Sequence, residues 1–267
     1  MKERSGRADF ARVRRFLAEE LDFESDYYDD AYLGRRVDAR IRRTDADSYA
    51  AYLRLLRRDA AEREAVLDSL AVNVTGFFRN PGVWEGIRDV LSDCGDRGRT
   101  RVWSAPCSDG RESYSLAMCA LEAGLGTRVS VLGTDIDRGA LENARQGVYR
   151  STRTKSIEEE LEPIRDLDAY VERTDDGVRV TDRVRRRVSF ERHDLLRDDP
   201  KRGFDLVCCR NFLIYIDAEY KRAVIENVAA AVEAGGYVVL GKTERMPGAC
   251  LDEFEKVDAS ARIYRRT

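Results

Sequence analysis

The sequence is poor in several residue types that define common kinds of functional site. Only one histidine, His193, occurs in 267 residues, and none of the six cysteines forms a Cys-x-x-Cys pair. This argues against a histidine-rich metal site and against a Ser-His-Asp triad, so any catalysis should proceed without histidine cycling. A chain of this length buries roughly 70–75% of its unfolded surface, so it needs neither metal nor disulfide to fold.

An excess of one charge and long apolar runs are also missing. The 47 basic and 50 acidic residues leave a net charge of −3, which argues against a general nucleic-acid binder with a net basic face. No stretch approaches the ~18 consecutive apolar residues of a membrane-spanning helix. The N-terminus lacks the apolar core of a signal peptide. We therefore expect a cytoplasmic globular protein with reduced thiols that binds no nucleic acid and does not insert into a membrane.

Residues 1–70 show only helical patterns. Apolar residues follow helical spacing over 10–21 and again over 32–41, Ser48 is placed to cap a third helix, and a fourth begins near Glu62. An arginine cluster accompanies the second stripe and comprises Arg35, Arg36, Arg40, Arg42 and Arg43. Two interpretations of this cluster stand side by side. It either steers an acidic partner or forms a solvated face balanced by neighbouring aspartates.

From residue 100 onward, short apolar strands alternate with helices. The expected strands are 101–105, 129–135, 188–190, 204–209 and 237–240, with a terminal antiparallel pair at 254–257 and 263–264. The expected helices are 114–121, 137–145 and 218–232. This alternation predicts a parallel sheet with helices on both faces. A hairpin around Gly177 interrupts it and predicts a small β insertion.

Acidic residues follow the ends of the first two strands. Glu112 lies just beyond the first strand, and Asp135 ends the second. In a doubly wound sheet, ligands bind across the carboxyl ends of the strands, and an acid there accepts both ribose hydroxyls. The loop lacks a G-x-G-x-x-G fingerprint, which disfavours a pyrophosphate. Together these features favour a cationic nucleoside such as S-adenosylmethionine (AdoMet). The alternatives are an ordinary β–α turn and a helix-capping role, which we expect for Asp137.

Five segments resemble, in order, motifs of the CheR family of chemotaxis receptor methyltransferases. They are NVTGFFRNP at 73–81, WSAPCSDGRESYS at 103–115, GTDID at 133–137, FDLVCCRNFLIYID at 204–217 and GGYVVLGKTE at 235–244. The resemblance implies an α/β fold, a Rossmann-like class I methyltransferase sheet with an all-helical N-terminal domain and a small β insertion. The expected boundaries are 1–72 for the helical domain and 73–267 for the AdoMet-binding domain, with the insertion at about 150–187.

The same resemblance implies an activity. Such an enzyme transfers the methyl group of AdoMet to glutamate side chains on the helical cytoplasmic bundle of chemoreceptors, leaves S-adenosylhomocysteine and uses no metal. Arg79 and Tyr215 would be catalytic, while Arg35, Arg36 and Arg40 would dock the receptor. The residues implied to contact the cofactor are Asn73, Thr75, Arg79, Glu112, Asp135, Asp194, Leu195, Arg210 and Asn211. We expect a monomer.

Some residues depart from the family pattern. Pro106 stands where glycine is usual, Arg111 replaces the first of two acids, Ser113 replaces proline, and Asp194 stands where asparagine is common, whereas Glu112 is retained. These departures leave the pose of the cofactor open. Two further hypotheses stand beside the methyltransferase: a non-catalytic AdoMet-responsive protein that docks on receptors, and an AdoMet enzyme for a small molecule. The insertion either tethers a receptor tail by strand addition or acts as a lid or spacer.

Overall fold

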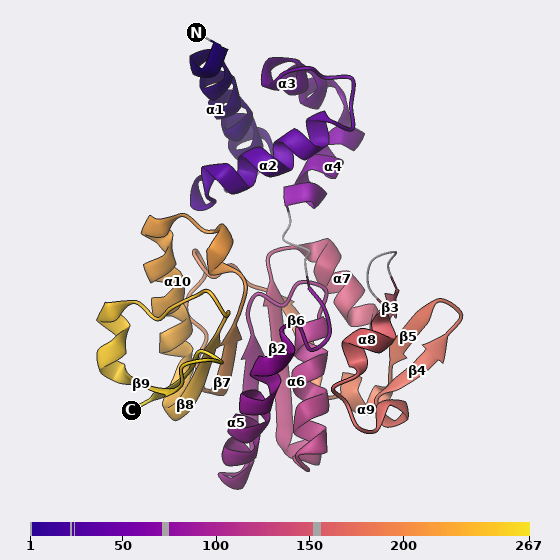
Figure 1. Ribbon diagram of the computed structural model, residues 1–267, viewed down its shortest axis with the longest axis vertical. Coiled ribbons are helices and arrows are strands. Elements are labelled where there is room, and N and C mark those ends of the chain that lie inside the picture. The colour runs from indigo at the N-terminus through magenta and orange to yellow at the C-terminus, as the bar shows by residue number, and fades with distance from the viewer. Residues whose placement is uncertain (1, 22, 24, 71–74, 152–155) are drawn as a thin grey trace. The chain divides into compact units, whose positions relative to one another are not determined.

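A computed structural model describes residues 2–21, 23, 25–70, 75–151 and 156–267 (Figure 1). Contacts within the chain divide it into two compact units. The first comprises Met1–Val72 and Tyr215–Lys221, and the second comprises Asn73–Ile214 and Arg222–Thr267. Thus Tyr215–Lys221, which the sequence assigns to the AdoMet-binding domain, is grouped with the helical unit. None of the helices in the described ranges is both long and apolar enough to cross a membrane.

The first unit is built from four helices, as its apolar spacing predicts. They are α1 (Lys2–Leu21), α2 (Asp30–Ile41), α3 (Tyr49–Arg58) and α4 (Ala60–Leu70), with a 3-10 turn η1 (Ser25–Tyr27). The predicted cap of α3 is confirmed, because the Ser48 hydroxyl oxygen accepts the Ala51 N–H at 3.2 Å. The distant segment joins this unit through an antiparallel bridge between Tyr28 and Ile216. The Asp217 N–H also donates to the Tyr27 carbonyl at 2.8 Å.

The second unit is organised around a seven-stranded sheet of order β6-β2-β1-β7-β8-β10-β9. The first five strands in this order are parallel, and β10 runs antiparallel to both β8 and β9. The strands are β1 (Thr100–Ser104), β2 (Val129–Asp135), β6 (Val188–Arg192), β7 (Phe204–Cys209), β8 (Val232–Leu240), β9 (Phe254–Asp258) and β10 (Ile263–Arg266). The predicted parallel sheet and terminal antiparallel pair are therefore confirmed.

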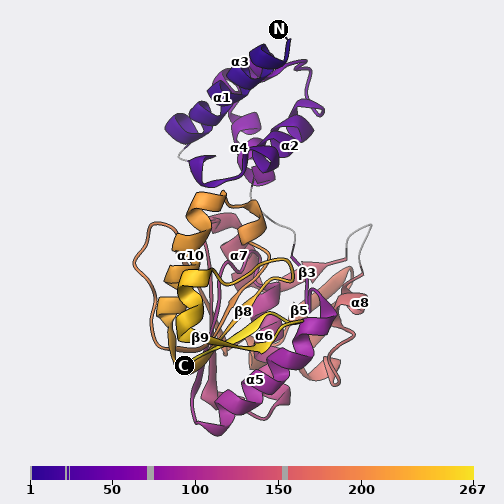
Figure 2. The ribbon, with the colours of Figure 1, turned by 60° about the vertical axis from the view of Figure 1, so that its left-hand side comes forward.

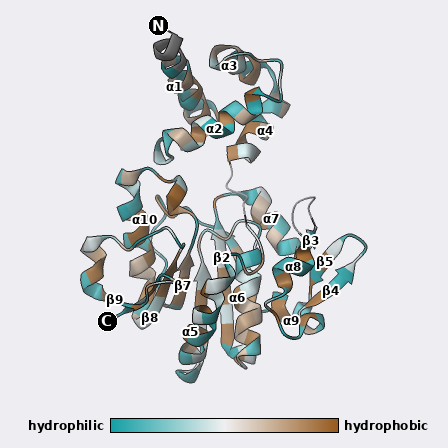
Figure 3. Cartoon of the chain, in the orientation of Figure 1, coloured by the Kyte–Doolittle hydropathy of each residue, from teal (hydrophilic) through white to brown (hydrophobic). Residues whose placement is uncertain are grey.

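Helices cover both faces of this sheet. α5 (Trp84–Asp96) and α6 (Arg111–Glu122) pack on one face, and α10 (Ala218–Ala231) packs on the other (Figure 2). α7 (Arg138–Gln146) follows β2 and contacts both β2 and β6. Successive side chains of β7 pack on opposite faces of the sheet. Cys208 lies in the hydrophobic cluster with α5 and α6, and Cys209 lies in the cluster with α10. Burial on both faces explains the nearly continuous apolar run of this strand, which is mostly brown in Figure 3.

The insertion forms a separate three-stranded antiparallel sheet of order β3-β5-β4. Its elements are β3 (Val148–Arg150), α8 (Ile157–Leu161), β4 (Val171–Thr174), β5 (Gly177–Val180) and α9 (Asp182–Arg185). The predicted hairpin is confirmed as β4 and β5. Gly177 is required because a β-carbon there would lie 1.9 Å from the Tyr149 carbonyl oxygen. The remaining 3-10 turns are η2 (Pro81–Val83), η3 (Gly126–Arg128), η4 (Leu167–Ala169), η5 (Leu213–Tyr215) and η6 (Gly248–Glu253).

Two elements differ from the sequence expectation. α10 ends at Ala231, and β8 begins at Val232 and includes Gly235 and Gly236, where the sequence suggested a helix stop. The pairing of β7 with β8 shifts register here, which accommodates the glycines inside a strand. α5 was not predicted, although its buried side chains follow helical spacing from Trp84 to Cys94.

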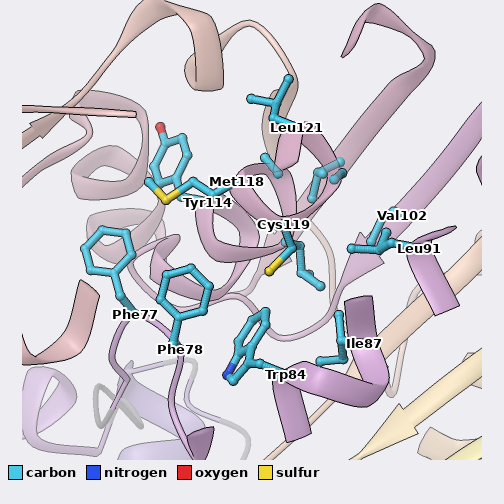
Figure 4. Packing of buried hydrophobic residues seen from close by; sticks show 14 of the residues in the cluster. Phe77, Phe78, Trp84, Ile87, Leu91, Val102, Tyr114, Met118, Cys119 and Leu121 are labelled. Carbon is cyan, nitrogen blue, oxygen red and sulfur yellow. The ribbon is translucent and has the colours of Figure 1, made fainter. Parts of the chain in front are cut away.

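Phe77 and Phe78 anchor the segment that leads into α5. Each is 1% exposed, and both lie in the cluster shown in Figure 4 with Tyr114 and Met118 of α6. Their rings make T-shaped contacts. The ring centroids of Phe78 and Trp84 lie 4.9 Å apart, and those of Phe77 and Tyr149 of the insertion lie 5.0 Å apart. The backbone that follows, including Arg79, is therefore held against the core by two adjacent aromatic side chains.

Candidate active site

Asp135 ends β2 at the carboxyl edge of the sheet. Its Oδ2 accepts the Ser108 N–H at 2.7 Å, and its Oδ1 accepts the Asp137 N–H at 3.0 Å. Burial raises the pKa of this carboxyl to about 6, against the opposing effect of the backbone donors. Each carboxylate oxygen keeps a second lone pair, so Asp135 can accept further hydrogen bonds from a diol. Asp137 instead caps α7 by accepting the Ala140 N–H at 2.9 Å, as predicted.

Glu112 lies in the first turn of α6, where the helix dipole favours a carboxylate. Its Oε1 accepts the Ser104 hydroxyl at 2.9 Å, and its Oε2 accepts Nη1 of Arg210 at 2.9 Å. Ser104 ends β1 and Arg210 directly follows β7, so three neighbouring elements converge on this carboxylate. Its side chain is 13% exposed. Lone pairs on both oxygens remain for a cationic ligand group.

Arg210 links Glu112 to the segment that carries Arg79. The guanidinium group is 2% exposed and lies 5.6 Å from the Trp84 ring centroid. Its Nη2 donates to the Arg79 carbonyl oxygen at 2.9 Å and lies 3.4 Å from the Asn80 side-chain oxygen. The Trp84 indole N–H donates to the same Arg79 carbonyl at 3.1 Å. The sequence predicts that Arg210 lines the cofactor site; the structure shows it holding two other predicted residues in place.

Strained backbone concentrates around these side chains. Phe78, Asn80, Ser108 and Asn211 have φ values of 47°, 61°, 49° and 59°, and Arg262 is the other non-glycine residue with positive φ among those described. Each such residue costs on the order of 1–3 kcal/mol and persists only where its surroundings over-determine it. Phe78 and Asn80 flank Arg79 in the chain, and Asn211 directly follows Arg210. The Ser108 N–H donates to Asp135. This clustering points to the carboxyl edge of the sheet as the functional site.

Glu244 is a residue of this edge that the predicted site set does not contain. Its carboxylate accepts the backbone N–H groups of Asn211 at 3.0 Å, Leu213 at 2.7 Å and Gly241 at 2.6 Å. Burial raises its pKa, and the backbone donors oppose that rise. It therefore holds the loop after β7 in which Asn211 lies. The signal available in the sequence was an acid that ends the last motif, four residues after the apolar run Tyr237–Leu240.

Of the remaining predicted cofactor residues, two follow β6 at the same edge, and the others are Thr75 and Asn73. Asp194 and Leu195 follow β6, and Asp194 Oδ1 accepts the N–H of Leu196 at 2.9 Å, so this carboxylate braces its own loop. Leu195 is 5% exposed. Thr75 is partly buried. Asn73 lies outside the described residues, so the structure does not address its predicted role.

Ile136 is a second residue missing from the predicted set. It directly follows Asp135, and its side chain is 42% exposed, one of few large apolar side chains so placed in the part of the chain described. An apolar group beside an acid at a strand end suits the flat ring of a nucleoside. The signal was present in the third motif as the residue between two acids.

Tyr215 and the predicted docking arginines belong to the first unit. The Tyr215 ring lies 4.9 Å from the Tyr32 ring of α2, and the Arg36 guanidinium lies 5.3 Å from the same Tyr32 ring. Burial raises the pKa of Tyr32, whose hydroxyl donates to the Leu70 carbonyl at 2.8 Å. A predicted catalytic residue and a predicted docking residue thus contact one buried tyrosine.

Arg40, a predicted docking residue, belongs to a hydrogen-bonded network inside the helical unit. Its Nε and Nη2 donate to the two carboxylate oxygens of Glu62 at 3.0 and 2.6 Å, and the Tyr52 hydroxyl donates to Glu62 at 2.6 Å. Glu62 is 7% exposed. This buried network ties α2, α3 and α4 together, so the guanidinium of Arg40 has a structural role in the helical unit, and its docking role stays a prediction. Arg35 is exposed, as docking requires.

The hydrogen-bond acceptors at this edge suit a cationic nucleoside. Asp135 ends β2, and Glu112 accepts the hydroxyl of Ser104 at the end of the adjacent strand β1. The two acids offer acceptors for hydroxyl and ammonium groups, and Ile136, next to Asp135, offers an exposed apolar side chain. These are the recognition needs of AdoMet, so the residues present fit the group. Within the described ranges, no three His, Cys, Asp or Glu residues are grouped to hold a metal ion.

Comparison with known proteins agrees with this geometry. The family described as "CheR methyltransferase, SAM binding domain" matches residues 73–263, and "CheR methyltransferase, all-alpha domain" matches residues 8–71. The chemotaxis protein methyltransferase of Listeria monocytogenes is 32% identical over 244 residues, covering 89% of this chain and 90% of that protein. The chemotaxis protein methyltransferase of Vibrio parahaemolyticus is 34% identical over 208 residues, covering 75% and 74%.

Among solved structures, the magnesium protoporphyrin IX methyltransferase of Synechocystis PCC 6803 with bound SAM aligns over 97% of each chain, at 16% identity and a TM-score of 0.43. The family matches extend over both parts of the chain, and the AdoMet-binding match contains every motif on which the resemblance rests. This chain belongs to the CheR methyltransferase family.

Proposed function

We propose that this protein methylates chemoreceptors for chemotactic adaptation, by transferring the methyl group of AdoMet to glutamate side chains of their helical cytoplasmic bundle. The products are glutamate methyl esters and S-adenosylhomocysteine. The observation that carries the proposal is the convergence of Asp135, Glu112 and the Arg210–Arg79 connection at one sheet edge. It occurs in a chain that matches both parts of the CheR family.

The cofactor site follows from the acids and the exposed isoleucine. Asp135 would accept the ribose hydroxyls, Glu112 would accept the methionine ammonium group, and Ile136 would pack against the adenine. Thr75, Asn211, Asp194 and Leu195 complete the proposed set from described residues, and Asn73 belongs to it on the resemblance. When bound, AdoMet supplies a methyl group made electrophilic by the sulfonium.

The chain's own residues have to orient the substrate and exclude water. A glutamate with a pKa of ~4.3 is already ionised at neutral pH, so no general base is needed. The sole histidine is consistent with this, because His193 is 5% exposed, packs against Trp103, and has its pKa lowered by burial. Catalysis then rests on alignment and electrostatics.

We assign the alignment to Arg79. Its planar guanidinium can bind a carboxylate in a fixed orientation, and its carbonyl is fixed by Trp84 and Arg210. Too tight a pair would weaken the nucleophile, so this arginine should orient the carboxylate without enclosing it. Tyr215 would shape the methyl pocket or donate a hydrogen bond to the substrate.

The partner proposal uses the first unit. Arg35 and Arg36 on α2 would steer an acidic receptor bundle, since charge complementarity mainly raises the rate of encounter. Arg36 and Tyr215 contact the same Tyr32 ring, so a docking contact and a proposed catalytic side chain share one buried neighbour. We propose that the protein acts as a cytoplasmic monomer.

The test is methyl transfer from labelled AdoMet to membranes that contain the cognate receptor. We expect incorporation that is released as volatile methanol by base, because carboxyl methyl esters are base-labile. Arg79→Ala should abolish most of the incorporation while AdoMet binding persists. Receptor binding without turnover in the parent protein would instead support the non-catalytic docking protein, and transfer to a small molecule alone would support the third hypothesis.

A further inference from the structure

The segment Phe77–Asn80 is neither helix nor strand, yet the backbone of nearly every residue in it forms a hydrogen bond. The Phe77 N–H donates to Oε2 of Glu160 at 2.8 Å, and the Phe78 N–H donates to the Ser115 hydroxyl at 3.1 Å. The Arg79 carbonyl accepts from two side chains, as described above. Positive φ at Phe78 and Asn80 means that this path is sustained by these anchors and not by local preference.

One of these anchors comes from the insertion. Glu160 lies in α8, and its side chain is 2% exposed. The other anchors of the segment come from α5, α6 and the loop after β7. The insertion thus contributes a buried carboxylate directly to the backbone that carries Arg79, in addition to forming its own sheet.

Arg111 faces Glu160 from the first turn of α6. Its Nη1 lies 3.6 Å from the carboxylate oxygen that accepts the Phe77 N–H, and its Nε lies 3.4 Å from Oδ2 of Asp109. Its guanidinium lies 5.2 Å from the Tyr149 ring centroid. An acid at position 111, as in the family motif, would place like charges together here. The arginine in this chain therefore complements the buried Glu160.

We propose that Glu160 is a positioning residue for methyl transfer, which fixes Phe77–Asn80 and thereby aims Arg79, and that Arg111 holds the Glu160 carboxylate in place. This inference rests on the proposed function of Arg79. It gives the insertion a role in supporting the active site, separate from that of a lid, a spacer or a receptor tether.

The chain offers a matched control for this role. Glu122 at the end of α6 accepts the Arg165 N–H of the insertion at 2.9 Å and lies 3.6 Å from Nη2 of Arg88. Its side chain is 15% exposed. Like Glu160, it joins the insertion to the main sheet through one backbone amide and one arginine. Its partners in the described part of the chain are Arg165 and Arg88 and not the Phe77–Asn80 segment, so its loss reports attachment of the insertion alone.

The kinetic test compares Glu160→Ala, Glu160→Gln, Arg111→Ala and Glu122→Ala with the parent. We expect Glu160→Ala to lower kcat about tenfold or more while the KM for AdoMet stays within about threefold, because misaligned reactants lose rate more than affinity. Glu160→Gln keeps an acceptor for the Phe77 N–H and should recover most of the rate. Arg111→Ala should have an intermediate effect. Glu122→Ala should leave kcat within about twofold of the parent value, even if its Tm falls as much as that of Glu160→Ala.

Equal losses of kcat in Glu160→Ala and Glu122→Ala, in step with their Tm values, would overturn the proposal. So would a Glu160→Ala variant that loses AdoMet binding and retains kcat at saturation. A parent protein that transfers no methyl group would contradict the proposed function, and a second measurement separates that outcome from this one.

That measurement is amide hydrogen exchange over residues 75–84, which needs no substrate. We expect Glu160→Ala to accelerate exchange at Phe77 and its neighbours by about tenfold or more, with no such change in Glu122→Ala. Unchanged exchange in Glu160→Ala would show that the carboxylate does not hold this segment, and would overturn the proposal whatever the activity.

Discussion

Arg210 and Arg40 each form a buried ion pair with a glutamate, one in each compact unit. Arg210 reaches Glu112 at 2.9 Å, and Arg40 reaches Glu62 at 2.6 Å. The Arg40 pair is completed by the Tyr52 hydroxyl and ties three helices together. The Arg210 pair extends to the Arg79 carbonyl, at a strand edge where residues of positive φ gather. The two arginines are alike in burial and pairing, and what distinguishes Arg210 is the backbone of positive φ around it at the sheet edge.

The largest expected effect comes from breaking the Arg210 pair. Arg210→Ala leaves Glu112 buried without its charged partner and releases the Arg79 carbonyl. We expect a loss of about 3–5 kcal/mol in the free energy of unfolding, together with at least about a hundredfold weaker AdoMet binding. Urea unfolding and calorimetry measure the two effects. Normal AdoMet affinity in a folded variant would show that the pair does not organise the cofactor site.

Breaking the corresponding pair in the helical unit should separate stability from cofactor binding. Arg40→Ala leaves Glu62 buried and unpaired, and we expect a loss of about 3 kcal/mol in unfolding free energy. AdoMet affinity should be unchanged below the unfolding transition. The double variant Arg40→Met with Glu62→Leu removes both charges and should recover much of the stability. A loss of receptor binding in that stable double variant would support Arg40 as a docking residue.

The role of Asp135 in the cofactor site can be tested by pH. Asp135 has a raised pKa of about 6, compared with an ordinary value of 3.8. Only its ionised form accepts from both ribose hydroxyls, so AdoMet affinity is complete above that pH. As the pH falls below it, the affinity should drop about tenfold per unit. Calorimetry at several pH values measures this slope. Asp135→Asn should bind weakly and without that slope, and a parent affinity that is flat down to about pH 4 contradicts the assignment.

The smallest expected effect concerns the exposed end of the arginine cluster. Arg35→Ala removes a solvated charge, so unfolding free energy should change by less than about 0.5 kcal/mol. The rate of receptor methylation at low ionic strength should fall about threefold, and the difference should vanish in high salt. An effect that is independent of salt would point to a direct contact in the complex and not to steering.

The parallel sheet and the acid at the end of its second strand could be predicted from the sequence, because short apolar strands alternate with helices and Asp135 directly ends one of them. Asp135 could be placed at this edge from the alternation, since parallel strands present their carboxyl ends together, whereas Arg210 entered only through the resemblance to the CheR family. Asp137 could be identified as a cap from its spacing. Arg40 could not be separated from Arg35, because both belong to one cluster and only packing shows that Glu62 faces one of them.

Residues that act through the backbone were the hardest to predict. Glu160 and Glu244 accept amide N–H groups from segments 83 and 33 residues away in the chain. No local pattern marks such a bond, because the partner is main chain and carries no residue-type signal. The grouping of Tyr215–Lys221 with the helical unit has no residue-type signal for a similar reason, since its pairings with Tyr27 and Tyr28 are between backbones.

The central claim is that the carboxyl edge of the sheet holds AdoMet through Asp135. The most direct test is calorimetric titration of AdoMet and S-adenosylhomocysteine into the parent protein and into Asp135→Ala at neutral pH. We predict binding in the micromolar range to the parent and loss of binding in the variant, with the variant still folded by circular dichroism. A folded parent that binds neither ligand, or a variant that binds both as tightly as the parent, would contradict the claim.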